Sequence, residues 1–201
     1  DFPSIALPSA PQAAKRFIED HASTLNVDPS QMKLLYTEIV GGKVYAKFQQ
    51  TYKGLDVMHA YVDLRISLDG RLFMFGSDAI RTLDVEVQPT VADIAAREFA
   101  KQGLPEHDSP FLVEGGDLKV LPLRYSDRIE THLAWNYRVH VSDLEIWDTW
   151  VDAHDGSILW RRNLVDHFDA HGDPKGTTSV LNGRVMINIY PDSYTKGSAI
   201  V

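Results

Sequence analysis

Apolar residues recur at every third or fourth position in two separate parts of the chain, and this spacing predicts two amphipathic helices. The first helix is expected to begin after Ser9, which can cap its first turn, and to end at Asn26. The second is expected from Thr90 to Gly103, because Gly103 suits the left-handed backbone that follows a helix. After each helix the apolar period changes to two, which predicts antiparallel strands.

The clearest strand runs from Met58 to Leu68, where even positions are apolar and odd positions are mostly polar. Gly41-Gly42 and Asp69-Gly70 tolerate the positive φ angles of two-residue hairpin turns, so the strands around them should pair antiparallel. A later strand places five apolar residues on one face, which favours core packing over a carbohydrate-stacking role for its aromatic rings. These residues are Leu133, Trp135, Tyr137, Val139 and Val141.

The order of these elements predicts an α+β fold of two successive modules, each a helix followed by an antiparallel meander, with a C-terminal β tail. The strand around Val180 to Tyr190 is not stable alone, so it must pair with this chain, with sequence beyond Val201, or with another molecule. The expected domains are a leader at 1–10, a first module at 11–85, a second at 86–164, a linker at 165–179, and a β tail or the start of a further domain at 180–201.

Composition removes several classes of function. The chain has 201 residues and a net charge of −8, so nucleic acid is a poor partner for it. It has no cysteine, which excludes disulfides, thiol catalysis and thiolate metal sites. No apolar run is long enough to span a membrane. The sequence starts at Asp1 in a Pro-rich leader, which favours removal of a signal peptide and a secreted protein, extracellular or periplasmic; an artificial boundary is the other explanation.

Candidate metal ligands are crowded only between Asp166 and Asp173, where His167, His171 and Asp169 are the weak candidates. Two histidines at this spacing reach one ion only on a helix, and the glycine and proline nearby oppose a helix. A solvated acidic linker is therefore the favoured interpretation. Metallopeptidase, phosphate-loop, dinucleotide and serine-hydrolase motifs are absent from the sequence, so we expect no catalytic residue and no cofactor.

Histidines elsewhere give no catalytic constellation. Asp152 and His154 could form an acid and base pair for proton transfer. The same residues, followed by Asp155-Gly156, are also typical of a hairpin turn, and we favour the turn. His59, His132 and His140 lie on polar faces of predicted strands, and the sequence places no Ser or Asp partner beside them.

The segment from Val44 to Val57 resembles the signature strand pair of the fungalysin/thermolysin propeptide (FTP) domain. That family shows an aromatic residue, Gln, a spacer, Tyr, a spacer, Gly, an aliphatic residue, usually Pro, and then Val. Asp56 stands where the family usually has Pro, so the turn is expected to be less rigid here. The residues that carry the resemblance are Phe48, Gln50, Tyr52, Gly54 and Val57.

The second module resembles a PepSY domain, which is cystatin-like. The strand from Leu133 to Val139, the Asp152-Ala153 pair and the strand that follows Gly156 match that family's ending. The resemblance implies that Trp135, Asp152 and Gly156 fix this module's turn, as Gln50, Tyr52 and Gly54 fix the turn of the first.

Together the two resemblances follow the order of secreted zinc-metallopeptidase precursors. They imply that the chain is not an enzyme but a propeptide that keeps a zymogen inactive, helping a downstream or partner catalytic domain to fold and inhibiting it. Its tail would lie along a cleft by β-augmentation, and the region 166–178 would be processed. An alternative is an extracellular interaction or structural module whose C-terminal strand pairs with a neighbouring subunit. An undetected hydrolase is the least favoured possibility.

Overall fold

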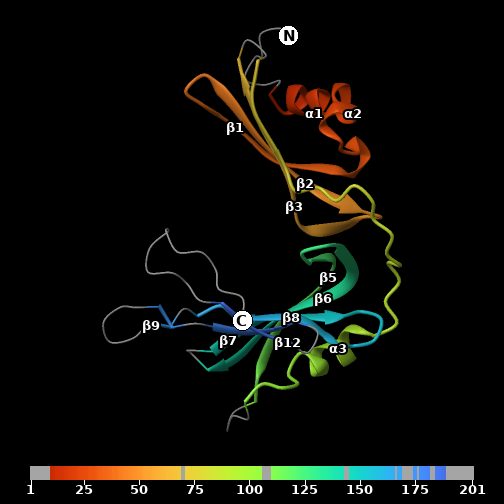
Figure 1. The fold of residues 1–201 in the computed structure, drawn as a ribbon, viewed down its shortest axis with the longest axis vertical. Coiled ribbons are helices and arrows are strands. Elements are labelled where there is room, and N and C mark those ends of the chain that lie inside the picture. The colour runs from red at the N-terminus through yellow and green to blue at the C-terminus, as the bar shows by residue number, and fades with distance from the viewer. Residues whose placement is uncertain are drawn as a thin grey trace. The chain divides into compact units, whose positions relative to one another are not determined.

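The computed structural model describes residues 10–68, 71–105, 110–142 and 145–165, and the backbone of four further short strands at 167–168, 174–175, 177–181 and 184–188 (Figure 1). The chain divides into two compact units. Unit 1 contains the chain up to Val85 together with residues 120–131. Unit 2 contains residues 86–119 and the chain from His132 onward.

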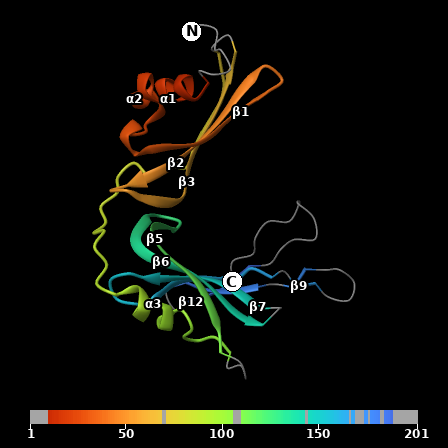
Figure 2. The ribbon, with the colours of Figure 1, turned by 180° about the vertical axis from the view of Figure 1, so that it is seen from behind.

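Unit 1 consists of an α-helical segment that packs on one face of an antiparallel sheet (Figures 1 and 2). Apolar side chains of the helix and of the central strands form its core, among them Phe17, Ile18, Val44, Phe48 and Leu64. Its elements are α1 (Ala10–Asp20), α2 (Ala22–Leu25), the 3-10 helix η2 (Pro29–Gln31), β1 (Met32–Val40), β2 (Lys43–Tyr52), β3 (Leu55–Ser67) and β4 (Leu72–Ser77).

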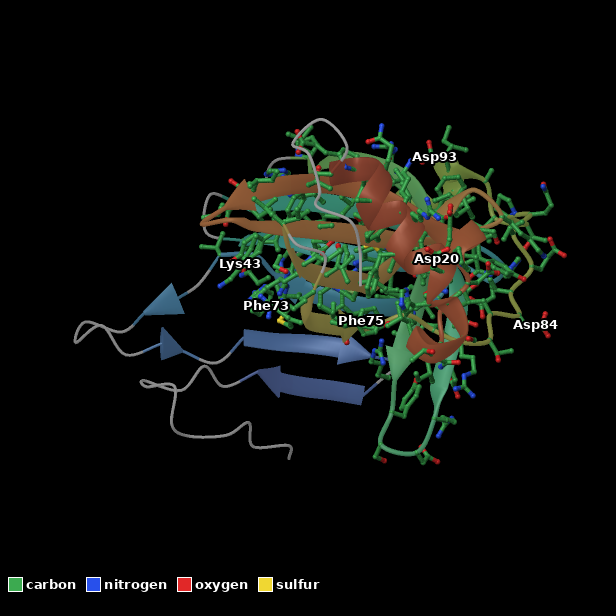
Figure 3. All side chains as sticks on the ribbon, turned by 90° about the horizontal axis from the view of Figure 1, so that it is seen from above. Asp20, Lys43, Phe73, Phe75, Asp84 and Asp93 are labelled. Carbon is green, nitrogen blue, oxygen red and sulfur yellow. The ribbon has the colours of Figure 1, made fainter. Side chains whose placement is uncertain are left out.

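Two local predictions for unit 1 are confirmed. The helical segment ends at Asn26, which has a left-handed backbone with φ 56°. Gly41 and Gly42 have φ angles of 57° and 73° and connect Val40 to Lys43, which are paired across the hairpin. The sheet face without the helix carries polar and aromatic side chains, and there the Lys43 ammonium lies 5.0 Å from the centre of the Phe73 ring (Figure 3). The predicted turn at Asp69-Gly70 lies outside the described residues.

Unit 2 packs one short helix on a β-sheet. Tyr137, Val139 and Val141 are buried against Ala96 and Ala100, and Trp135 packs on the same cluster, so the predicted core face of this strand is confirmed. The helix is shorter than predicted and ends before Gly103, which has a left-handed φ of 73°. The later elements are α3 (Asp93–Phe99), β5 (Leu112–Arg124), β6 (Ile129–Ser142), β7 (Glu145–Asp152) and β8 (Ile158–Asn163). The end of β5 and the start of β6, within residues 120–131, belong to unit 1, and the rest belongs to unit 2.

The predicted fold of two separate helix-plus-meander modules is wrong. The described strands form mainly one mixed sheet with the order β1-β2-β3-β5-β6-β7-β8, and β4 pairs with β3. The parallel contact that joins β3 to β5 is between Val57 and Val120. The three α-helices of the described residues are short, with 11, 4 and 7 residues. Local periodicity identifies strands, but the partner that a strand selects depends on contacts distant in sequence.

Beyond residue 165 four short strands are placed: β9 (His167–Phe168), β10 (Pro174–Lys175), β11 (Thr177–Leu181) and β12 (Arg184–Asn188). β11 pairs antiparallel with β12 and lies against β8. The weak metal candidates Asp169 and His171 fall outside the described residues, as does the side chain of His167. In the described part of the chain, helices long and apolar enough to cross a membrane are absent.

Candidate functional site

The turn between β2 and β3 is built by residues 53 and 54. Tyr52 pairs with Leu55, and the two residues between them, Lys53 and Gly54, have φ angles of 48° and 88°. Positive φ at both central positions is the geometry of a type I′ hairpin turn, which matches the twist of the strands. Asp56, at the position where the FTP family usually has Pro, lies 3.4 Å from the Lys33 ammonium.

Immediately after this turn β3 contains a bulge. The register between β2 and β3 shifts beyond Gln49, and His59 has a left-handed φ of 57°. The bulge interrupts the alternation only at its own position: Val57 and Ala60 are both buried, although they are three residues apart. From Ala60 to Ile66 the even positions are buried, as the sequence predicts. A β-bulge leaves ladder groups unpaired, so these carbonyls need another donor.

The Gln49 side chain supplies that donor. It is 5% exposed, and its amide nitrogen lies 2.6 Å from the Val57 carbonyl oxygen and 3.1 Å from that of Ala60. The amide therefore bonds to the backbone across the bulge. Gln49 lies within the segment from Val44 to Val57 that resembles the FTP motif. The sequence gives no signal of its role, because the bulge is not visible in the pattern of apolar and polar positions.

Gln50 points to the opposite face of β2 and binds another backbone segment. Its side-chain oxygen accepts from the Ile80 N–H at 2.8 Å, and its nitrogen donates to the Ile80 carbonyl at 2.9 Å. The same nitrogen lies 2.9 Å from the Gln31 side-chain oxygen. The amide thus imitates a strand backbone and fixes the segment that follows β4. Phe48 and Val57, which carry the same motif, are buried.

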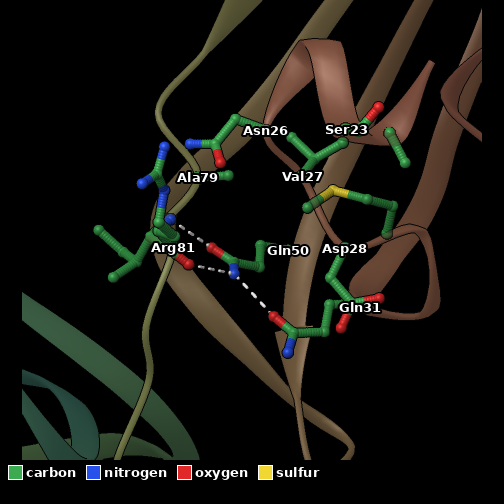
Figure 4. Close-up of a pocket in the computed structure, with 11 residues that line it drawn as sticks. Ser23, Asn26, Val27, Asp28, Gln31, Gln50, Ala79 and Arg81 are labelled. Carbon is green, nitrogen blue, oxygen red and sulfur yellow. Dashed lines mark hydrogen bonds between the residues drawn. The ribbon is translucent and has the colours of Figure 1, made fainter.

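A pocket of about 270 Å³ lies beside Gln50, between the end of the helical segment and residues 79–81 (Figure 4). Gln50 and Ile80 form its buried floor, and the remaining wall is a mixture of apolar and polar side chains. The 11 residues that line it all belong to unit 1.

In unit 2 the Asp152 carboxylate organises the turn between β7 and β8. One of its oxygens accepts from the backbone N–H of His154 at 2.7 Å and, at 3.4 Å, from that of Asp155. The other oxygen accepts from Nδ1 of His132 at 2.9 Å. The structure therefore gives His132 an acidic partner that the sequence did not place, and both carboxylate oxygens are engaged in holding the turn.

Burial raises the pKa of Asp152, since a carboxylate loses hydration there. The hydrogen bonds from His132 and from the two backbone N–H groups, with the charge of His132, outweigh burial and bring the pKa below its ordinary value. Asp152 is thus held as a carboxylate, which suits a hydrogen-bond acceptor and not a proton donor.

The same turn holds the chain that enters α3. The Ala153 carbonyl accepts from the backbone N–H groups of Thr90 and Val91, both at 2.9 Å, and the Thr90 hydroxyl donates to the His154 carbonyl at 2.6 Å. The His154 ring nitrogen Nε2 lies 3.1 Å from the carbonyl of Glu86 and donates to it. The turn predicted for these residues is present, and its His is used to bind backbone.

Gly156 and Trp135 fix the helix against this turn. Gly156 has a φ of 79°, and a Cβ placed on it would lie 2.4 Å from Cε2 of Phe99 in α3. The Trp135 indole nitrogen donates to the Val91 carbonyl at 2.9 Å. Both residues therefore contact α3 or the chain that enters it.

Two further buried polar groups connect α3 to the sheet. The Tyr137 hydroxyl donates to the Asp93 carboxylate at 2.7 Å, and burial, followed by this hydrogen bond, raises the pKa of Tyr137. Arg161 is 5% exposed and donates to the carbonyls of Ala100 and Gln102 at the end of the helix, both at 2.7 Å. Burial lowers the pKa of Arg161 to about 10.

Sequence reasoning missed Arg161, although a signal existed. In β8 the buried positions alternate, and Arg161 falls between the buried Leu159 and Asn163. A positively charged side chain at a buried position of a strand needs several hydrogen-bond acceptors, and the carbonyl groups at the end of a nearby helix provide them.

The remaining histidines are not brought together: His59 is exposed in the bulge, and His140 faces Glu114 at 3.1 Å. Within the described residues no cluster of three potential metal ligands is found.

Comparison with known proteins gives one family match. Residues 35–79 match the model of the Fungalysin/Thermolysin Propeptide Motif, which confirms the resemblance seen in the first module. The search of curated proteins returned no match. Among solved structures, the Bacillus megaterium YpeB C-terminal domain is 17% identical, with a TM-score of 0.37, and the alignment covers 79% of this chain and 65% of that one.

The structural likeness is too low to assign a fold or a function to the second unit, so its PepSY character stays a prediction. The family match is confined to unit 1 and includes β2, β3, β4 and most of β1. Residues 35–79 thus carry the fungalysin/thermolysin propeptide motif, which supports a non-catalytic propeptide of a secreted metallopeptidase.

Proposed function

We propose that this chain is the pro-region of a secreted zinc metallopeptidase, where it assists the folding of the catalytic domain and inhibits it until processing. The observation that carries the proposal is the propeptide motif at residues 35–79. Such a protein is expected to be exported together with its enzyme, and its partner is the peptidase catalytic domain.

The hydrogen bonds of the buried polar side chains support a role in which the chain presents a fixed surface to a partner protein. Gln49, Gln50 and Asp152 direct their hydrogen bonds mainly to backbone, and each holds a turn, a bulge or a connecting segment in place. A surface held rigid before binding loses less conformational entropy when a partner docks, which favours a tight inhibitor. A folding template needs a surface that is fixed in this way.

We extend the proposal to unit 2, which we take to be a PepSY-like module. The support is its sequence: Trp135, Asp152 and Gly156 stand at the family positions, and each has a defined structural contact here. Its tail would follow the cleft of the peptidase through main-chain hydrogen bonds, with proteolytic processing in the region 166–178.

The test uses the catalytic domain of the cognate metallopeptidase, expressed without a pro-region. It is denatured and refolded with and without an equimolar amount of this chain, and peptidase activity is then measured after the chain has been digested away. We expect more recovered activity with the chain, and inhibition of the native enzyme at micromolar concentrations of added chain. Absence of both effects would refute the proposal.

A second candidate function is favoured by one observation. β8 stands at the end of the main sheet order, and β11 lies against it without joining that sheet. A strand held in this way can be exchanged with the same strand of a second copy, which would make the chain an extracellular interaction module. Size measurement over a range of concentrations tests this: a monomer at every concentration excludes it, whereas oligomers abolished by deleting the residues after Asp166 support it.

A further inference from the structure

The pocket beside Gln50 has polar groups of opposite charge on opposite sides. Arg81 and Asn26 lie next to each other on one side, while Asp28 and Gln31 lie on the other (Figure 4). The apolar surface between them comes from Val27 and other side chains. Those other apolar lining residues are Ala22, Met32, Ala79 and Ile80.

Several of these polar groups have no partner among the described residues. The Arg81 guanidinium and the Asn26 amide form no hydrogen bond or ion pair there. The Gln31 oxygen accepts from Gln50, which leaves the Gln31 nitrogen as a free donor. Asp28 uses one carboxylate oxygen to accept from the Ser30 N–H and hydroxyl, at 2.9 and 2.7 Å, and its second oxygen is available to a ligand.

The wall of the pocket is held in place before any ligand binds. Gln50 fixes both backbone groups of Ile80, so the segment that carries Arg81 leaves the sheet in one position. On the other side Asn26 has the left-handed backbone that ends the helix, and Asp28 caps η2. The backbone on both sides is therefore fixed, while the side chains of Asn26, Asp28 and Arg81 are exposed. Polar groups placed around an apolar surface are the usual composition of a small-molecule site.

We propose that this pocket binds a small zwitterion, namely a free α-amino acid with an aliphatic side chain. Its carboxylate would lie at Arg81 and Asn26, its ammonium group at the free oxygen of Asp28, and its side chain on Val27 and Met32. The pocket, at about 270 Å³, is smaller than the ~300–1,000 Å³ of drug-sized sites, which selects a ligand of amino-acid size. The inference is independent of the proposed pro-region function.

The experiment titrates the full chain with leucine and follows backbone amide resonances by NMR. Because the pocket is open to solvent, we expect saturable shifts confined to residues 22–32, Gln50 and residues 79–81, with a dissociation constant on the order of millimolar. Two derivatives separate the charges: leucinamide lacks the carboxylate, and N-acetyl-leucine lacks the ammonium group. Each should bind at least about threefold more weakly than leucine.

Two variants assign the contacts. Arg81→Gln should weaken leucine and N-acetyl-leucine by about fivefold and leave leucinamide unchanged. Asp28→Asn keeps the oxygen that caps η2, and it should weaken leucine and leucinamide but not N-acetyl-leucine. Arg16→Gln, on the exposed side of α1, is the matched control and should change none of the affinities.

The proposal is overturned if leucine gives no saturable shift up to about 50 mM, a concentration well above the dissociation constant expected for this ligand. Equal binding of leucine and its two derivatives would also overturn it, because charge recognition would then be absent. If only a peptide or a partner peptidase shifts these resonances, the pocket belongs to a protein interface, and the amino-acid site is refuted.

Discussion

Replacement of Gln50 by Met tests whether its amide fixes the segment after β4. The side chain is 2% exposed, and Met has a similar length without a donor or a strong acceptor. The change leaves the N–H and the C=O of Ile80, a residue 8% exposed, without their partner. A buried backbone group without a partner costs about 1–3 kcal/mol, and water from the adjacent pocket can reduce this, so we expect unit 1 to lose about 2–3 kcal/mol.

The readout must report on unit 1. All 4 tryptophans lie in unit 2, so fluorescence would miss the effect, and hydrogen exchange at the Ile80 amide is the direct measurement. We expect faster exchange at Ile80 and lower stability of the β1 to β4 amides to urea. Gln12→Met, at an exposed position of α1, is the control and should change the stability by less than about 0.5 kcal/mol. Unchanged exchange at Ile80 in Gln50→Met would show that the amide pair is not important to the fold.

Three further predictions concern the turns and unit 2. Since the pKa of Asp152 is lowered on folding, its stabilising effect is complete above about pH 4 and is lost as the pH falls through the folded-state value. Asp152→Asn has a neutral side chain that does not titrate, so the stability of unit 2 should depend less on pH in the acid range. Unfolding at each pH is followed by tryptophan fluorescence. In Gly156→Ala the new methyl group would have a positive φ and would collide with the Phe99 ring, so we expect unit 2 to lose about 2–4 kcal/mol of stability in urea unfolding. Gly54 also has a positive φ but has open space around it, so Gly54→Ala should cost unit 1 only about 1 kcal/mol, measured by amide exchange. Arg161→Lys cannot reach both carbonyls at the end of α3, so unit 2 should lose about 2–3 kcal/mol in urea unfolding followed by fluorescence.

Each of these has a result that would contradict it. An acid unfolding curve of Asp152→Asn identical to that of the unmodified chain would mean that the carboxylate is not coupled to folding. Equal losses in Gly156→Ala and Gly54→Ala would show that the ring contact relaxes freely. A Lys at position 161 that preserves stability would show that one donor is enough to hold the helix end.

Sequence patterns determined the local elements because these depend on neighbouring residues. The period of apolar positions and the left-handed preference of Asn26 placed the end of the first helical segment, and two glycines placed the first hairpin turn. The FTP resemblance also came from the order of a few residues along the chain, and residues 35–79 carry that motif. None of these conclusions required knowledge of contacts distant in sequence.

Tertiary structure alone decided how the strands combine. The pattern predicted two separate modules, yet β3 and β5 meet in a parallel pair at Val57 and Val120, far apart in sequence. The bulge around His59 shifts the alternation of β3, and no periodic pattern contains such an inserted residue. A long-range pairing is selected by the total burial that it allows, and that quantity is not encoded in any single window of sequence.

The polar groups of the candidate sites divide in the same way. Gln50, Asp152 and Gly156 could be chosen from sequence because a family motif or a turn signal marks them, but their partners could not be named. Ile80 and His132 become partners only when segments about 20 to 30 residues away fold back onto them. The sequence therefore determines which residues are candidates for the site. The hydrogen bonds that give each of them its role depend on the folded chain, because a buried polar group must pair with the donors and acceptors that packing brings to it.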